Sequence, residues 1–122
     1  MAGTWACGPT GNPAEFLGRW EATLKGVAKP GTPPDIVKSL ERVRVDLKPD
    51  GSAVVVLMSM PYTGIWRGDS PITVRLTQVL GKPLPAKDVF EVKLDYKQGR
   101  VQVYKEWIAI RRISETVPAD GT

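Results

Sequence analysis

Hydrophobic and polar residues alternate in short segments along most of this chain, and the first clear segment runs from Leu17 to Gly26. Within it Trp20, Ala22 and Leu24 fall on one face, and charged or polar residues fall on the other. A period of two with one apolar face is typical of a half-buried β-strand. We therefore expect the first strand here, with Trp20 as a core residue that closes one end of the fold. Stacking against a ligand is the alternative role for this ring.

The same alternation recurs downstream, between sequences that are typical of tight turns. Pro49-Asp50-Gly51 combines a proline that fixes φ with a glycine that allows positive φ. From Val101 to Ile113 the hydrophobic parity shifts, which predicts a β-bulge near Tyr104 to Trp107 or a break into two strands. The inward-facing residues expected in the other segments are Val43, Val45, Leu47, Ile72, Val74, Leu76, Phe90, Val92, Leu94 and Tyr96.

The segment from Ser52 to Met60 differs because both of its faces are apolar. One face carries Val54, Val56, Met58 and Met60, and the other carries Ala53, Val55 and Leu57. We expect the following Pro61-Tyr62-Thr63 to break the strand. A strand that is apolar on both faces needs a cover on its outer side. Two covers are open, a neighbouring helix or a second copy of the chain in a homodimer formed through this strand.

A short helix is expected between the first two strands, from Pro33 to Leu40. Thr32 can cap its start, and proline suits the first helical position. Ile36 and Leu40 are four residues apart and share one face. We expect that face to cover apolar surface on the barrel.

These elements predict an all-β fold, an antiparallel up-and-down β-barrel of seven to eight strands with one short helix between the first two strands. Tight turns between consecutive strands favour this neighbour-to-neighbour order over a Greek-key sandwich. A chain of 122 residues forms one domain. We expect a flexible arm over residues 1–13, the barrel over residues 14–114 and a frayed tail over residues 115–122.

Composition excludes several kinds of function. The net charge of +4 comes from 17 basic and 13 acidic residues without a basic run, so we expect no nucleic-acid partner. The chain has no histidine, which removes the commonest metal ligand and the commonest general base. It has one cysteine, Cys7, so an intramolecular disulfide is impossible. We expect neither a metal nor a cofactor.

No apolar run is long enough for a transmembrane helix, so no membrane-spanning segment is expected. The start of the chain lacks the regions of a signal peptide. A secreted or cell-envelope location, with the signal removed, and a cytoplasmic location both stay open. Cys7 follows Ala6 as in a lipoprotein cleavage site, and a lipidated Cys7 is one possibility.

Four short motifs occur in an order that is known from a protein family. They are Leu17-Gly18-Arg19-Trp20, the hairpin Lys48-Pro49-Asp50-Gly51, Gly64-Ile65-Trp66 followed by Gly68-Asp69, and Ile110-Arg111-Arg112-Ile113. From about Phe16 to Ser114 the chain resembles the small bacterial lipocalin-like domains of the calycin group. The resemblance implies that Trp20 closes the barrel floor and that Arg112 or Arg111 packs over it. Parity favours Arg112, which continues the row of Ile108 and Ile110 and would stack on the indole.

Catalysis has little support in the sequence. The carboxylates lie mainly on turns and polar strand faces, and Glu106, where the parity is ambiguous, is the one inward candidate. No glycine-rich phosphate loop and no cysteine pair for zinc is present. A barrel enzyme that uses a buried carboxylate is therefore a lesser alternative.

The sequence favours a non-catalytic barrel that binds a small apolar ligand, such as a lipid, in its interior. An eight-stranded barrel is just wide enough to be filled by side chains or to hold one small ligand. The alternative is a filled-core module that binds another protein or itself. A cavity larger than ~300 Å³ would favour the carrier. The expected ligand-lining residues are Val45, Val56, Met58, Met60, Leu76, Phe90, Leu94, Tyr96 and Tyr104.

Overall fold

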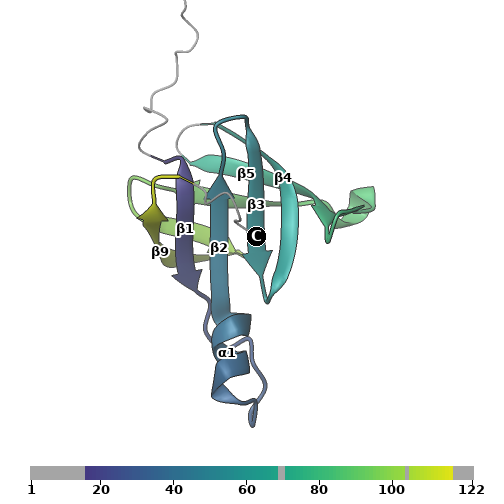
Figure 1. Cartoon of the computed structure of the whole chain (residues 1–122), viewed down its shortest axis with the longest axis vertical. Coiled ribbons are helices and arrows are strands. Elements are labelled where there is room, and N and C mark those ends of the chain that lie inside the picture. The colour runs from purple at the N-terminus through teal and green to yellow at the C-terminus, as the bar shows by residue number, and fades with distance from the viewer. Residues whose placement is uncertain (1–15, 69–70, 104, 117–122) are drawn as a thin grey trace, which may run out of the picture.

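Eight antiparallel strands close into a barrel in the computed structural model, which describes residues 16–68, 71–103 and 105–116 (Figure 1). In chain order the elements are β1 (Gly18–Thr23), α1 (Pro34–Glu41), β2 (Arg42–Leu47), β3 (Ser52–Leu57), β4 (Met60–Gly68), β5 (Ile72–Val79), β6 (Lys82–Pro83), a 3₁₀ turn (Ala86–Asp88), β7 (Phe90–Asp95), β8 (Arg100–Val103) and β9 (Glu106–Ser114).

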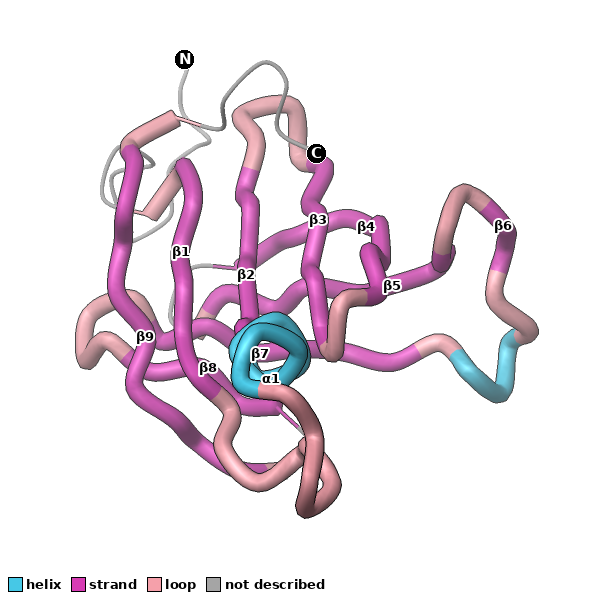
Figure 2. Tube along the Cα trace, turned by 60° about the horizontal axis from the view of Figure 1, so that its bottom comes forward, coloured by secondary structure: helices cyan, strands magenta, loops and turns pink. Residues whose placement is uncertain are grey.

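The ring runs β1-β2-β3-β4-β5-β7-β8-β9 and closes where β9 pairs with β1. The two-residue strand β6 pairs with the end of β5 in a loop that extends away from the ring (Figure 2). Each barrel strand therefore lies beside its neighbours along the chain, which is the up-and-down order. The fold class predicted from the sequence is confirmed, including the single short helix between β1 and β2.

The core lies inside the ring and consists of the apolar residues that alternate along the strands. Trp20, Ala22 and Leu24 are buried, as the first segment predicted. Side chains with no exposed surface come from five other strands, namely Val45, Leu47, Val55, Ile72, Val74, Leu76, Leu94 and Val101. Because period-two alternation sends every second side chain to one face, the same pattern that forms the strands fills the barrel.

Aromatic side chains seal the end of the barrel at which β1 begins. The indole N–H of Trp20 donates to the Phe16 carbonyl oxygen at 2.8 Å. The Phe16 ring lies 5.2 Å from the rings of both Trp66 and Tyr96. The indole N–H of Trp66 donates to the Lys48 carbonyl oxygen at 2.7 Å. The Trp20 ring is buried and the Trp66 ring is half-buried, and both indoles satisfy their polar N–H groups.

Both Gly-x-Trp motifs place their glycine where a neighbouring strand comes very close. A Cβ on Gly18 would lie 2.1 Å from the Ser114 carbonyl oxygen, and a Cβ on Gly64 would lie 1.8 Å from that of Arg75. The strand register shifts near each glycine, in the β1–β9 and β4–β5 pairings. The first residue of each motif must therefore be glycine, because the backbone of the neighbouring strand leaves no room for a Cβ at the bulge.

Helix α1 projects from the opposite end of the barrel (Figure 1). It begins at Pro34, and the Thr32 hydroxyl donates to the Lys29 carbonyl oxygen at 2.6 Å instead of capping the helix. The helix contains no buried residue, and Ile36 is 50% exposed. The prediction that the apolar face of this helix covers the barrel is therefore wrong for Ile36, while Leu40 is half-buried.

The connection between β3 and β4 differs from the expectation. The chain turns at Met58 and Ser59, which have φ values of 50° and 67°, and Leu57 pairs with Met60. Two successive positive φ angles are typical of a type I′ hairpin turn. The expected break at Pro61-Tyr62-Thr63 is wrong, because β4 continues through these three residues. The β4–β5 pairing instead shifts its register at a bulge between Thr63 and Gly64.

The last segment breaks into two strands, so the second of the two alternatives is right. Strand β8 ends at Val103, β9 begins at Glu106, and these two residues pair. Glu106 is exposed, which removes the one inward carboxylate that the sequence suggested. The expected N-terminal arm over residues 1–13, with Cys7, lies outside the described residues, as do Tyr104 and residues 117–122 of the expected tail.

Candidate functional site

The residues expected to line a ligand cavity do not surround one common space. Val45, Leu76 and Leu94 face the barrel interior, and Tyr96 is buried at the sealed end. Phe90 is half-buried at the start of β7, which the antiparallel pairings place at the end where β1 finishes. Its ring centroid lies 5.1 Å from that of Tyr62.

Three residues of the expected lining do not face the interior. Val56 is half-buried on the outer face of β3, because the inward row of that strand is Ala53, Val55 and Leu57. Met58 and Met60 are 39% and 37% exposed at the β3–β4 turn. Both faces of this segment are apolar, so alternation alone could not decide which row points inward.

Inward side chains in the middle of the barrel have no exposed surface. A void that admits a water-sized probe would give its lining side chains accessible surface. Val45 on β2 has 0% exposure, as do Val74 and Leu94 on the adjacent strands β5 and β7. No such void borders these side chains.

Arg112 has a partner other than the expected one. It lies opposite Trp20 in the β1–β9 register. Its Nε donates to the Leu17 carbonyl oxygen at 2.9 Å, and its Nη2 donates to the same atom. The Arg100 guanidinium lies over an aromatic ring, 4.7 Å from the ring centroid of Trp107. Arg111 is exposed on the outer face, as its parity predicted.

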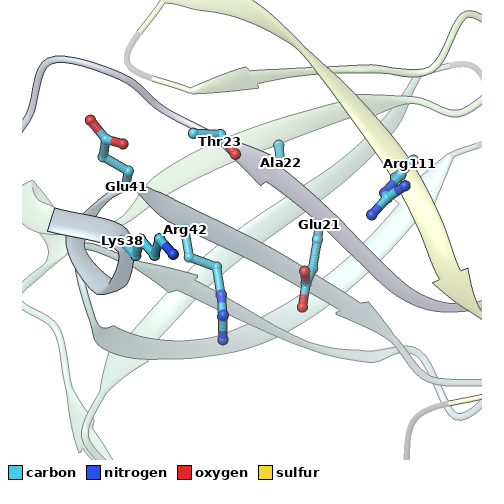
Figure 3. Close-up of a pocket in the computed structure, with 7 residues that line it drawn as sticks. All are labelled: Glu21, Ala22, Thr23, Lys38, Glu41, Arg42 and Arg111. Carbon is cyan, nitrogen blue, oxygen red and sulfur yellow. The ribbon is translucent and has the colours of Figure 1, made fainter. Parts of the chain in front are cut away.

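Hollows lined by described residues lie on the outer surface, beside α1. The first, which we call the α1 hollow, has a volume of about 270 Å³ (Figure 3). It is bordered by β1, α1, the start of β2 and β9. Its lining residues are Glu21, Ala22, Thr23, Lys38, Glu41, Arg42 and Arg111.

Strand register explains why these side chains meet. Thr23 pairs with Arg42 across β1 and β2, and Glu21 pairs with Arg111 across β1 and β9. All four positions have outward parity. Helix α1 runs directly into β2, and Lys38 stands four residues before Arg42, which places it on the same side of the junction.

The α1 hollow contains three cationic side chains and two carboxylates. Between described residues the ion pairs are Arg19–Asp46, Arg44–Asp46 and Arg100–Asp95, and none of them includes a residue of the hollow. Glu41 accepts a hydrogen bond from the Gly26 amide at 3.4 Å. Within the described part of the chain, Lys38, Arg42 and Arg111 therefore form no ion pair.

A buried carboxylate organises the neighbouring surface. Asp46 has 0% exposure although it lies on the outer face of β2. Arg19 donates to it through Nε at 2.9 Å and through Nη2 at 3.1 Å, and the Nε of Arg44 lies 3.4 Å away. This bidentate pair fixes β1 against β2.

A second hollow of about 490 Å³ lies on the other side of Lys38 and Arg42, which line both. It reaches to Val56 on β3 and to Ser59 in the β3–β4 turn. The hydroxyl oxygens of Ser39 and Ser59 are 2.6 Å apart, a hydrogen bond that ties α1 to this turn. The helix is therefore attached to the barrel by polar contacts more than by apolar packing.

No motif in the sequence marks the residues of the α1 hollow as a site. The sequence does show that Arg42 belongs to the outward row of β2 and that Lys38 lies four residues before it. It does not show that Arg111 of β9 joins them, because β9 lies beside β1 only when the barrel closes. The described residues contain no group of three or more histidine, cysteine, aspartate or glutamate side chains that would hold a metal ion. No helix in the described ranges is long and apolar enough to cross a bilayer.

The closed antiparallel barrel of eight strands is consistent with a calycin-like fold. Its sealed end carries the tryptophan of the first strand and an arginine of the last strand as direct neighbours. Comparison of the chain with protein-family models, with curated proteins and with solved structures finds no match in any of the three.

Proposed function

We propose that this chain is a non-catalytic, lipocalin-like barrel with a filled core, which acts as a binding module through its outer surface. The observation that carries the proposal is the absence of exposed surface on inward side chains such as Val45, Val74 and Leu94. The motif order supports the lipocalin-like part, with Trp20 and Arg112 adjacent at the sealed end.

Packing energetics favour the surface over the interior. Inserting extra groups into a well-packed core costs typically ~1–3 kcal/mol even for a few methylenes. A ligand pocket of ~300 Å³ or more would need many core side chains to move. The α1 hollow, by contrast, is already open at about 270 Å³ and offers charged groups without repacking.

Titration with neutral apolar probes tests the proposal. Nile red and a long-chain alcohol should give no saturable signal, and methyl NMR resonances of Val45 and Leu94 should not shift. Leu94→Ala is the matched positive control, because truncating a fully buried leucine opens a cavity that can admit a small apolar molecule such as benzene. Stoichiometric binding to the unaltered chain with shifts at Val45 would overturn the filled-core proposal.

A carrier of a small apolar ligand is the second candidate, and one observation favours it. The end that carries α1 is less sealed than the other, since Tyr62 and Phe90 there are half-buried. In a carrier, the ligand would enter past this pair. The same titration would then show saturable binding, with NMR shifts at Tyr62 and Phe90 and weaker binding by Phe90→Ala.

Self-association through the outer face of β3 is a further proposal within the same function. Val54 and Val56 are apolar and half-buried on that face. Light scattering coupled to size exclusion measures the oligomeric state directly. A dimer that dissociates in Val56→Lys supports this interface, whereas a monomer at all concentrations removes it.

A further inference from the structure

We propose that the α1 hollow is a binding site for a phosphate group, carried by a small soluble ester or by a lipid headgroup. The proposal rests on the proposed function, in which the outer surface binds and the interior does not. It starts from three cationic side chains that reach one open hollow from three different elements.

The cations surround the hollow from different directions. Figure 3 shows Lys38 and Arg42 together on one side, Arg111 on the other side, and Glu21 between them. Arg42 and Arg111 are two strands and two residues apart, which corresponds to about 12 Å between Cα atoms from standard sheet spacings. Two long side chains can approach one small anion from that separation, with Lys38 as a third donor.

This arrangement suits a tetrahedral oxyanion better than a carboxylate. A carboxylate presents two oxygens in one plane, whereas a phosphate presents oxygens in several directions and carries more charge. Each guanidinium has a planar fork of N–H donors that matches two phosphate oxygens. The Thr23 hydroxyl, which also borders the hollow and is exposed, adds a neutral donor.

Three arginines of the barrel, Arg19, Arg44 and Arg100, form ion pairs with described carboxylates, and the cations of the hollow do not. Arg19 binds Asp46 in a bidentate pair, and Arg100 pairs with Asp95. Lys38, Arg42 and Arg111 form no ion pair within the described residues, although Glu21 and Glu41 border the same hollow. The three cations outnumber the two carboxylates, so an incoming anion would meet one excess positive charge in the hollow.

The effect of substituting Glu21 on affinity distinguishes an anionic ligand from a cationic one. Its carboxylate stands between the cations and competes with an incoming anion (Figure 3). Glu21→Gln keeps the shape and removes the charge, so it should tighten phosphate binding by about three- to tenfold. A ligand that instead carries an ammonium group would bind Glu21→Gln more weakly.

The test is an amide NMR titration with inorganic phosphate, and with acetate at the same ionic strength. We expect phosphate-dependent shifts at Thr23, Lys38, Arg42 and Arg111, with a Kd on the order of millimolar, and weaker binding of acetate. The double variant Arg42→Gln with Arg111→Gln should lose at least about tenfold in affinity. Arg75→Gln is the matched control, because Arg75 is an exposed outward arginine on β5, on the opposite side of the ring.

Absence of phosphate-dependent shifts at these residues would overturn the inference, as would an equal loss of affinity in Arg75→Gln or weaker phosphate binding by Glu21→Gln. Co-sedimentation with phosphatidylglycerol and phosphatidylcholine vesicles separates the two sources. Binding to the anionic vesicles that the double variant loses assigns the phosphate to a lipid headgroup, and phosphate binding without vesicle binding assigns it to a soluble ester. The apolar-probe titration reports on the filled core independently, so either proposal can fail alone.

Discussion

Arg112 lies directly opposite Trp20 across the β1–β9 pairing, and its guanidinium donates to the Leu17 carbonyl oxygen. The strand that closes the barrel thereby holds the chain just before the strand that opens it. The same segment supplies the Phe16 carbonyl oxygen that the Trp20 indole binds. One short stretch before β1 is thus fixed from both sides by hydrogen bonds to the side chains of Trp20 and Arg112.

Substitution of Arg112 should weaken this closure. Arg112→Met keeps much of the aliphatic length but leaves the Leu17 carbonyl oxygen without its charged donor, so we expect a loss of about 1.5–3 kcal/mol in the free energy of unfolding. Arg111→Met, on the exposed neighbour, should change stability by less than about 0.5 kcal/mol. Urea unfolding followed by tryptophan fluorescence measures both. Equal effects of the two variants would contradict a structural role for the Arg112 hydrogen bonds.

Much of the barrel follows from local rules that the sequence displays directly. Alternation identified the buried row of β1, and the turn residues Pro49 to Gly51 identified the β2–β3 hairpin. The change in the hydrophobic pattern after Val103 correctly predicted that the strand ends there. The inward row of β9 is independent of that of β8, because a turn separates the two strands.

The remaining features depend on contacts that only the closed barrel creates. The Met58-Ser59 turn has none of the residues that usually accept positive φ, so the strand boundary could not be read from it. Arg112 was expected to stack on Trp20, but a nearby carbonyl oxygen offers a guanidinium a stronger partner than a ring face. The α1 hollow joins β1 and β2 to β9, so nothing local marks its residues as neighbours.

Asp46 should contribute strongly to stability in spite of its position on an outer face. Its side chain is 1% exposed and accepts both donors of Arg19. Asp46→Ala would leave largely buried guanidinium groups without their carboxylate, and we expect a loss of about 3 kcal/mol or more. The control is Arg100→Gln in the more exposed pair with Asp95, which should cost at most about 1 kcal/mol. Urea midpoints measure the stability loss of each variant. A larger loss in Arg100→Gln than in Asp46→Ala would contradict a stabilising role for Asp46.

The Asp50 carboxylate in the β2–β3 turn should have a pKa below its ordinary value. The hydroxyl and then the amide of Ser52, which donate to Oδ1 at 2.6 and 2.9 Å, lower the pKa of Asp50 below its ordinary value of 3.8. A lowered folded-state pKa means that this stabilisation is fully present above pH ~4 and is lost as the pH falls through the folded-state value. Ser52→Ala should raise the pKa of Asp50 toward 3.8 without fully restoring it, because the amide donor remains. Carboxyl NMR titration measures the shift, and an unchanged pKa would exclude the hydroxyl as the main cause.

Gly64 should accept a side chain poorly, because the atoms that an added Cβ would meet belong to the backbone of β5. Gly64→Ala would place a Cβ 1.8 Å from the Arg75 carbonyl oxygen, so β4 and β5 must separate at the bulge. We expect a loss of about 3 kcal/mol or more, at the upper end of overpacking costs. Gly31→Ala is the control: it has φ of +87° but nothing within 4 Å of the added Cβ, so it should cost only about 1 kcal/mol of backbone strain. Urea unfolding gives the two free energies, and amide exchange along β4 and β5 should accelerate in Gly64→Ala alone. If both variants lose the same stability, positive φ at the turns matters as much as strand approach, and the close contact at the second Gly-x-Trp motif does not explain its glycine.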